Sequence, residues 1–198
     1  MNFKERPLSW SAISSWEYNK EQWAKKYLDN IKEPANPAML FGHLIGQAIA
    51  QKHSQAPKVP HGSVWEYKMV AKVGNIPLLG YADSFEPSPP IMDEYKTHGV
   101  NGWSQKRVDE HGQFTMYALL LYLQDKIHPK DLGIRLSAIP VRSKNDFSME
   151  VNNDLPILTF ETKRTMADIL RFGAYIKAVV KDMKSYEQWY FANKERIE

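Results

Sequence analysis

The sequence contains no cysteine among its 198 residues. Disulfide bonds, thiolate zinc sites, cysteine nucleophiles and cysteine-bound iron–sulfur clusters are therefore excluded. Any bound metal must be held by oxygen or imidazole ligands, which favours Mg2+ or Mn2+ over metals that prefer softer ligands. The composition predicts that a metal site, if the chain has one, is of this hard-cation type.

Long hydrophobic runs are also missing, because the longest, residues 118–123, is far too short to cross a bilayer. Residues 1–6 lack the apolar core of a signal peptide, so we expect a cytoplasmic protein that does not contact a membrane. The net charge of +3 is too small to indicate nucleic acid by itself. Lysines and arginines gather in 20–32 and 163–184, which fits either a nucleic-acid patch or solvated helix faces.

The hydrophobic share of 43% and the charged share of 25% are typical of a globular chain, and the length suits a single domain over 1–198. The patterning predicts N-terminal helices within 11–53, a sheet and helix core over 64–141, and a C-terminal helix over 163–184. The first helix is expected over 11–30 with Ser11 as its N-cap. The second is expected over 39–52, where Gly42, Gly46 and Ala50 allow close packing.

Alternating residues and turn signals predict strands over 64–73, 76–85 and 91–96, joined as an antiparallel meander. A helix over 108–124 and a buried strand over 132–141 follow, and this strand can pair in parallel with an earlier one. A turn over 142–146 and short edge strands over 147–151 and 157–160 complete the pattern. The fold class is therefore α/β, with a central mixed β-sheet flanked by helices.

Two carboxylates, Asp83 and Glu94, are expected near the ends of adjacent strands beside a proline-rich turn. Neighbouring strands lie about 4.8 Å apart, so carboxylates on one face can share a cation. Magnesium keeps several waters, so these two side chains and the backbone carbonyl of Tyr95 suffice as protein ligands. Lys96 lies two residues beyond Glu94 and so faces the same side.

The ammonium of Lys96 could orient or help deprotonate an attacking water, or neutralise a phosphate. The alternative is a surface ion pair between Glu94 and Lys96, with Asp83 only ending a strand. Gln113 and Tyr117 are four residues apart on one helix face, where they could bind a phosphate, a sugar or a base. Their alternative roles are a solvated glutamine and a tyrosine at the edge of the core.

In this order, Gly80-x-x-Asp83, Glu94-x-Lys96-Thr97 and Gln113-x-x-x-Tyr117 resemble the RecB-like exonuclease branch of the PD-(D/E)XK nuclease superfamily. Residues 8–16 resemble the serine- and aromatic-bearing start of this branch, and residues 41–45 resemble the start of its G-x-x-x-H helix. The resemblance covers most of the chain.

The resemblance implies a restriction-endonuclease-like core and cleavage of DNA with Mg2+ or Mn2+. Asp83 and Glu94 would be metal ligands and Lys96 the catalytic lysine, with Gln113 and Tyr117 near the DNA. Glu66, on the preceding strand, matches an acidic position that supports the metal through water. Its alternative is an exposed strand glutamate.

The chain departs from the pattern at Gly46, where the branch carries a histidine that is associated with exonuclease-type sites. His43 or Gln47 could substitute, although a lone helical histidine is more often structural or exposed. The second departure is the missing cysteines, with which several relatives join their termini through an iron–sulfur cluster. Here the first helix, with Trp16, Trp23 and Tyr27, is expected to pack against the last helix instead.

The predicted function is that of a metal-dependent DNA nuclease, with exonuclease action expected first and endonuclease action open. It would act on single strands or duplex ends in recombination, repair or phage DNA processing, with a protein partner from such a process. One alternative is a non-catalytic nucleic-acid-binding module, which the joint presence of Asp83, Glu94 and Lys96 disfavours. Another is an adaptor that uses the C-terminal aromatic residues.

Overall fold

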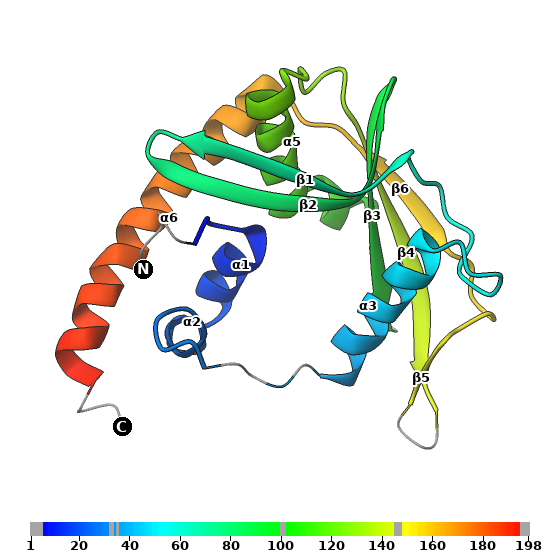
Figure 1. Cartoon of the computed structure of the whole chain (residues 1–198), viewed down its shortest axis with the longest axis horizontal. Coiled ribbons are helices and arrows are strands. Elements are labelled where there is room, and N and C mark those ends of the chain that lie inside the picture. Colours follow the sequence, from blue (N-terminus) through cyan, green and yellow to red (C-terminus); the bar gives the residue numbers. More distant parts are fainter. Residues whose placement is uncertain (1–5, 32–33, 35, 100–101, 145–147, 195–198) are drawn as a thin grey trace.

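A six-stranded mixed β-sheet forms the centre of the computed structural model, which describes residues 6–31, 34, 36–99, 102–144 and 148–194 (Figure 1). The strands are β1 (Val64–Val73), β2 (Ile76–Pro87), β3 (Pro90–His98), β4 (Gly133–Ser143), β5 (Met149–Val151) and β6 (Leu158–Thr162). The helices are α1 (Trp10–Tyr18), α2 (Lys20–Tyr27), α3 (Pro37–Ala50), α4 (Gln105–Asp109), α5 (Gly112–Asp125) and α6 (Met166–Asn193).

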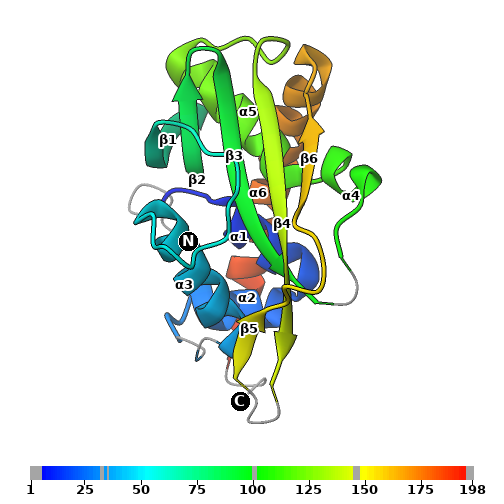
Figure 2. The ribbon, with the colours of Figure 1, turned by 90° about the vertical axis from the view of Figure 1, so that its right-hand side faces the viewer.

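The strands lie in the order β1-β2-β3-β4, and β4 also pairs with both β5 and β6 (Figure 2). Pairing is antiparallel throughout except between β3 and β4, which are parallel and joined by a crossover through α4 and α5. The antiparallel meander, the parallel fourth strand and the mixed α/β class predicted from the sequence are therefore confirmed.

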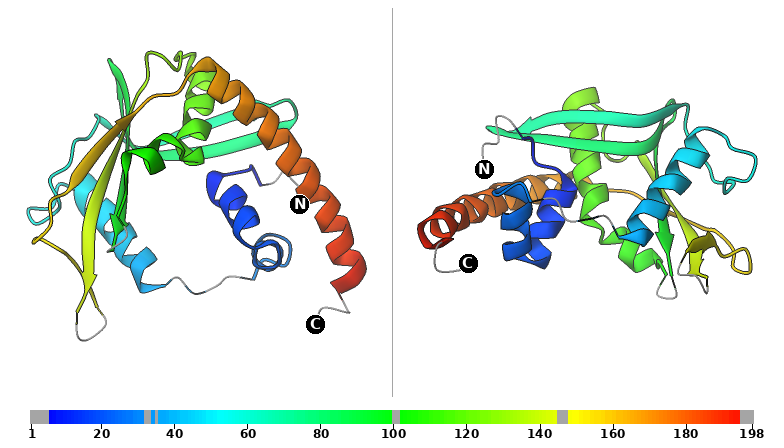
Figure 3. Two further views of the ribbon diagram at one scale, coloured as in Figure 1. Left: turned by 180° about the vertical axis from the view of Figure 1, so that it is seen from behind. Right: turned by 60° about the horizontal axis from the view of Figure 1, so that its bottom comes forward.

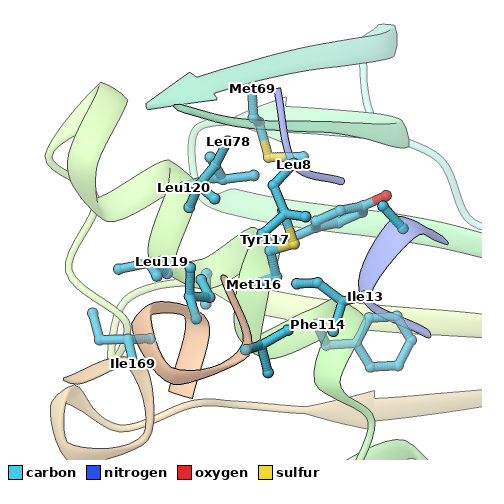
Figure 4. Close-up of a cluster of buried hydrophobic side chains, with 14 of the residues drawn as sticks. Leu8, Ile13, Met69, Leu78, Phe114, Met116, Tyr117, Leu119, Leu120 and Ile169 are labelled. Atoms are coloured by element: carbon cyan, nitrogen blue, oxygen red, sulfur yellow. The ribbon is translucent and has the colours of Figure 1, made fainter. Parts of the chain in front are cut away.

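Helix α5 supplies the side chains that join the sheet to the helical layer. Phe114 and Leu120 of α5, Leu78 of β2 and Ile13 of α1 lie together in the core (Figure 4). All four are fully buried, and burial of such a side chain contributes roughly 1.5–3 kcal/mol. This shared core fixes α5 and α1 on the same side of the β1–β2 hairpin.

A short N-terminal segment pairs with β2 and sets the position of α1. The Leu8 N–H donates to the Pro77 carbonyl at 2.9 Å, and the Leu79 N–H donates to the Leu8 carbonyl at 3.0 Å. Backbone pairing between β2 and β3 covers only residues 84–87 of β2, so this edge of β2 is open to Leu8. The start of α1 is thereby held beside the part of β2 that β3 has left.

The predicted helix over 11–30 is wrong in detail, because the chain forms two helices that meet at Asn19. Asn19 is extended, and its side chain accepts from the N–H groups of Glu21 and Gln22, which caps α2 and interrupts α1. The N-cap of α1 is Ser9 and not Ser11, since the Ser9 hydroxyl accepts from the Ala12 N–H.

The predicted helix over 108–124 is likewise two helices, because His111 is extended and separates α4 from α5. The last helix begins at Met166 instead of residue 163, where Thr165 and Asp168 form a capping box, and it continues to Asn193. Strand β4 extends through Ser143, so it includes the start of the predicted turn. Residues 145–147 of the predicted turn and edge strand lie outside the described residues.

Aromatic packing joins the two ends of the chain, and the C-terminal half of α6 runs beside α1 and α2 (Figure 3). The ring centroid of Trp16 lies 5.0 Å from that of Trp23 and 5.3 Å from that of Tyr186. The Tyr190 hydroxyl donates to Asp29 at 2.7 Å, which adds a polar contact between α6 and the segment that follows α2. The expected docking of the first and last helices by packing is confirmed.

The helices within the described ranges include none that is long and apolar enough to cross a membrane. The cytoplasmic location and the single domain over 1–198 stay predictions from the sequence.

Candidate active site

Strands β2 and β3 separate in their middle, and the candidate site lies where they part. Their backbone pairing ends at Ser84 and Asp93. Beyond that pair the Tyr95 N–H donates to the Asp83 carboxylate, with 2.6 Å between the nitrogen and Oδ2. The sequence predicted Asp83 and Glu94 near the ends of their strands, and this is wrong. Both lie within long strands, because β2 and β3 extend further than the sequence pattern indicated.

Glu94 is the most buried acidic group of the site, with 3% of its surface exposed. Its Oε1 atom accepts from the Lys96 ammonium at 2.6 Å and from the Gln113 amide at 2.7 Å. Its Oε2 atom is buried and has no hydrogen-bond partner among the described residues. A buried carboxylate oxygen normally has a partner, so this atom marks a position suited to a ligand.

Burial and the neighbouring Glu94 charge raise the pKa of Asp83 to about 7. The Tyr95 N–H and the Lys96 charge lower this pKa, and the Glu66 charge raises it further, but burial and Glu94 dominate. Two ionised carboxylates in a partly buried place repel each other, and a cation between them relieves that repulsion. Asp83 and Glu94 thus form a pair whose joint ionisation is costly without an added positive charge.

Lys96 is held as an ammonium by its acidic neighbours. Burial lowers its pKa, but the charge and hydrogen bond of Glu94 and the charge of Asp83 outweigh this effect, and the pKa is raised overall. About a third of the side chain, 34%, remains exposed, so it can also reach a ligand. A charged lysine is a donor and a counter-ion, and it cannot accept a proton from water.

Gln113 is buried, so it is not the solvated residue that the sequence left as an alternative, and Tyr117 is buried as well, in keeping with a place at the core. The Gln113 amide donates to Glu94 at 2.7 Å and to the Tyr117 hydroxyl at 2.9 Å. Both residues therefore hold Glu94 in place from α5. Burial and the Glu94 charge raise the pKa of Tyr117, so its hydroxyl stays protonated. Contact with DNA stays a prediction for both.

The structure explains why the G-x-x-D segment begins with a glycine, Gly80. A Cβ atom at this position would lie 2.8 Å from Cε1 of Tyr117 and 2.9 Å from Cδ1 of Leu120. Only a residue without a side chain lets α5 approach β2 so closely. The position of the Tyr117 ring beside the site depends on this contact.

Helix α3 borders the site through a cavity of about 100 Å3, whose lining includes His43, Gly46, Glu66 and Asp83. Glu66 is exposed and has a left-handed backbone (φ 46°), and it lies between Trp65 and Tyr67, which pair with the two neighbours of Asp83 on β2. Such strain in a non-glycine residue is common near functional sites. His43 is exposed, and its Nε2 lies 3.0 Å from Nε2 of Gln47.

Gly42 and Gly46 on α3 differ in their surroundings. A Cβ atom at Gly42 would lie 3.2 Å from the Thr97 hydroxyl, which fits the expected close packing. A Cβ atom at Gly46 would meet nothing within 4 Å, so this residue borders open space facing the carboxylates. The described part of the chain contains no group of three or more histidine, aspartate or glutamate side chains arranged to hold a metal, so His43 and Glu66 do not complete such a set.

The donors nevertheless fit a hard divalent cation. Asp83 and Glu94 supply carboxylate oxygens, one of them the unpartnered Oε2 atom, and magnesium needs only one or two protein carboxylates because it keeps bound waters. The raised pKa of Asp83 is the second sign, since burial and the charge of Glu94 both oppose its ionisation and a bound cation would offset them. The Tyr95 carbonyl stays a predicted third ligand.

The reverse face of the same strands carries a second polar cluster that sequence reasoning missed. Asp93 is 1% exposed and forms a two-pronged ion pair with Arg135, with N–O distances of 2.7 and 3.1 Å. The Ser84 hydroxyl donates to Asp93 at 3.0 Å and lies 3.1 Å from the Tyr95 hydroxyl. Side chains alternate along a strand, so the sequence could have placed Asp93 on the face of β3 opposite to that of Glu94.

A cavity of about 620 Å3, the inner cavity below, lies on the Lys96 side of the site. It is bounded by Lys96, Gln113 and Tyr117, by the start of α1 including Trp10, and by His111. Sequence reasoning missed Trp10 as a site residue and missed His111 altogether. The only signal for His111 was its place two residues before Gln113.

No protein-family model matches the chain, and no curated protein matches its sequence. Among solved structures, the alkaline exonuclease LHK-Exo of Laribacter hongkongensis is similar, with a TM-score of 0.53, 13% identity, and coverage of 99% of this chain and 98% of that chain. LHK-Exo in complex with dAMP gives a TM-score of 0.50 and 11% identity, over 97% of this chain and 95% of that chain. A provisionally assigned exonuclease from Eubacterium rectale gives a TM-score of 0.59 and 8% identity, over 93% of this chain and 84% of that chain.

At these identities the likeness shows the fold alone: the chain has the fold that these exonucleases share.

Proposed function

We propose that the chain is a metal-dependent deoxyribonuclease that hydrolyses phosphodiester bonds as an exonuclease, on single strands or duplex ends. The observation that carries the proposal is the unpartnered, buried Oε2 atom of Glu94 beside Asp83 and the Lys96 ammonium. Such a grouping of two carboxylates and one cation is costly to bury and has no evident packing benefit.

Asp83 and Glu94, with the carbonyl of Tyr95, would hold Mg2+ or Mn2+. When bound, such an ion supplies Lewis acidity and lowers the pKa of its water. Gln113 and Lys96 share the Oε1 atom of Glu94, so they fix the carboxylate while its Oε2 atom stays available. Tyr117 in turn fixes the Gln113 amide.

Lys96 acts as a charged donor in this proposal. Its raised pKa favours two of the three roles considered for it, orientation of the attacking water and neutralisation of the phosphate, over deprotonation of water. Its partly exposed side chain lies at the wall of the inner cavity, where a phosphate would enter. The proton of the water must therefore leave to the solvent or to another group.

The exonuclease assignment is supported by the fold shared with LHK-Exo, which was solved with dAMP, and by the Eubacterium rectale protein. On this basis we place the protein in recombination, repair or phage DNA processing. The histidine that the branch associates with exonuclease-type sites is replaced by Gly46 in this chain. Endonuclease action is therefore the alternative mode of cleavage that the assay must distinguish.

The test is cleavage of single- and double-stranded DNA, labelled at either end, in the presence of Mg2+, Mn2+ or EDTA. We expect metal-dependent release of mononucleotides or short products. Lys96→Gln, which keeps a donor toward Glu94 but removes the charge, should lose about a hundredfold or more in rate, as is typical when charge stabilisation is removed.

The matched control is Lys68→Ala, which removes an exposed lysine from β1 and should leave the rate unchanged. Internal cuts would correct the mode to endonuclease. Binding of DNA without cleavage under every metal would overturn the proposal in favour of the non-catalytic binding module.

A further inference from the structure

A second cavity adjoins the inner cavity and is unused by the proposed chemistry. This outer cavity has a volume of about 400 Å3, and its lining includes Trp10, Lys106, Arg107 and His111. Trp10 and His111 also line the inner cavity, which contains Lys96. The two cavities therefore share one wall, formed by Trp10 and His111.

The shared wall is aromatic and firmly placed. The ring centroid of His111 lies 5.7 Å from that of Trp10 and 5.2 Å from that of Trp103. A Cβ atom at Gly112 would lie 2.3 Å from the Trp10 ring, so the indole packs directly on the start of α5. Trp10 is nevertheless only partly buried, which leaves part of the ring available to a ligand.

The charges around this wall suit a phosphate backbone. Lys96 lies at the inner end, and exposed Lys106 and Arg107 lie at the outer end. The Arg107 guanidinium lies over the Trp103 ring at 4.4 Å, which keeps it beside the cavity. Glu110 is an acidic residue in the lining, and its carboxylate lies 4.0 Å from the Lys106 ammonium.

His111 adds a hydrogen-bonding group but no charge. Burial and the nearby charges of Lys96, Arg107 and Arg164 lower its pKa to about 4, so the ring is neutral at pH 7. Its Nδ1 atom is buried and has no hydrogen-bond partner among the described residues. A neutral imidazole between aromatic rings suits the edge of a base better than a phosphate.

We infer that the Trp10–His111 wall is a stacking site for the nucleobase that adjoins the bond at Lys96, in single-stranded DNA. This inference rests on the proposed function for the identity of the Lys96 end. A base stacks on the Trp10 ring, and its backbone phosphates lie toward Lys96 and toward Arg107. A base inside a duplex already has both faces stacked on its neighbours, so the site favours unpaired or frayed ends.

The test uses binding in EDTA, which requires neither metal nor cleavage. Oligothymidylates that lack one base at successive positions are titrated with the protein and followed by fluorescence anisotropy. One position should weaken binding to the wild-type protein by about 5- to 100-fold, as expected for loss of one stacked base. In Trp10→Leu the intact oligonucleotide should bind more weakly, and loss of that base should cost little more.

Trp189→Leu is the matched control, because this tryptophan is 51% exposed and lines neither cavity. It should keep the full penalty for the missing base. An equal penalty in the wild type and Trp10→Leu would overturn the inference, and so would a wild type with no sensitive position.

If Trp10→Leu does not fold, the wild type is crosslinked to an oligonucleotide with 5-iododeoxyuridine at the sensitive position. A crosslinked peptide that contains Trp10 supports the inference, and crosslinks only elsewhere overturn it. The two proposals fail separately. Cleavage without a Trp10-dependent base penalty rejects only the stacking site, whereas such a penalty without cleavage rejects only the nuclease.

Discussion

Asp83→Asn should stabilise the metal-free protein, although it removes a residue of the proposed active site. The asparagine keeps an oxygen that can accept from the Tyr95 N–H and removes the charge that repels Glu94. In the folded chain the pKa of Asp83 is about 7, against 3.8 for an ordinary aspartate. Because the folded pKa is raised, ionised Asp83 destabilises the fold, and this cost is complete only above pH 7.

The magnitude follows from the size of the shift. Each pKa unit corresponds to about 1.4 kcal/mol, so a rise of roughly three units gives an upper limit of about 4 kcal/mol. Asp83 is only partly buried and shares its repulsion with Glu94, so we expect a gain of about 1–3 kcal/mol at pH 8. For a chain of this length that gain raises the melting temperature by about 2–12 °C.

The assay is thermal and denaturant unfolding in EDTA at pH 8 and pH 4. The gain should shrink as pH falls from 7 toward 4, because the wild-type Asp83 then becomes protonated and loses its repulsion. Addition of Mn2+ should stabilise the wild type, by mass action, and leave Asp83→Asn almost unchanged. The reasoning is refuted if the variant is less stable than the wild type in EDTA at pH 8.

Asp93→Asn is the matched control, because it neutralises a buried aspartate one residue from Glu94 on the same strand. This carboxylate is already paired with Arg135, so the substitution leaves a cation without its partner. It should destabilise the protein by about 2–4 kcal/mol at pH 8, the opposite sign to Asp83→Asn. Equal effects of the two substitutions would contradict the conclusion that Asp83 lacks a sufficient counter-charge and Asp93 has one.

Three further predictions concern the surroundings of the site. Gly46→His should tighten Mn2+ binding about tenfold, measured by calorimetry, because the residue borders open space beside the carboxylates, and Gly46→Ala should not. Gly80→Ala should cost about 1–3 kcal/mol of unfolding free energy and slow cleavage, because its Cβ displaces the Tyr117 ring; unchanged stability and rate would contradict this contact. Trp23→Ala should cost about 3–5 kcal/mol and speed proteolysis of α6, whereas Trp189→Ala, at an exposed position, should do neither.

The sequence predicted the composition of the site better than its arrangement. Asp83, Glu94, Lys96, Gln113 and Tyr117 were identified from order and spacing, because a strand alternates its faces and a helix repeats every turn. These local rules place Lys96 and Glu94 on one face, and the ion pair between them follows.

The boundaries of elements were less predictable, because single side chains decide them. Asn19 divides the first helix by capping the second, and His111 separates α4 from α5, although the apolar pattern continues through both places. Hydrophobic periodicity reports which face is buried and does not register a cap that competes with helix continuation.

What the sequence alone determined is the chemistry that is possible: no thiolate ligands, two carboxylates, one lysine, and an order of strands and helices that predicts a mixed sheet. Only the tertiary structure decided which groups meet. Leu8 pairs with β2 and lies beside it where β3 has parted from it, and the start of α1 brings Trp10 next to His111, about a hundred residues away. Such contacts depend on the packing of distant segments around one core, and no local spacing rule encodes them.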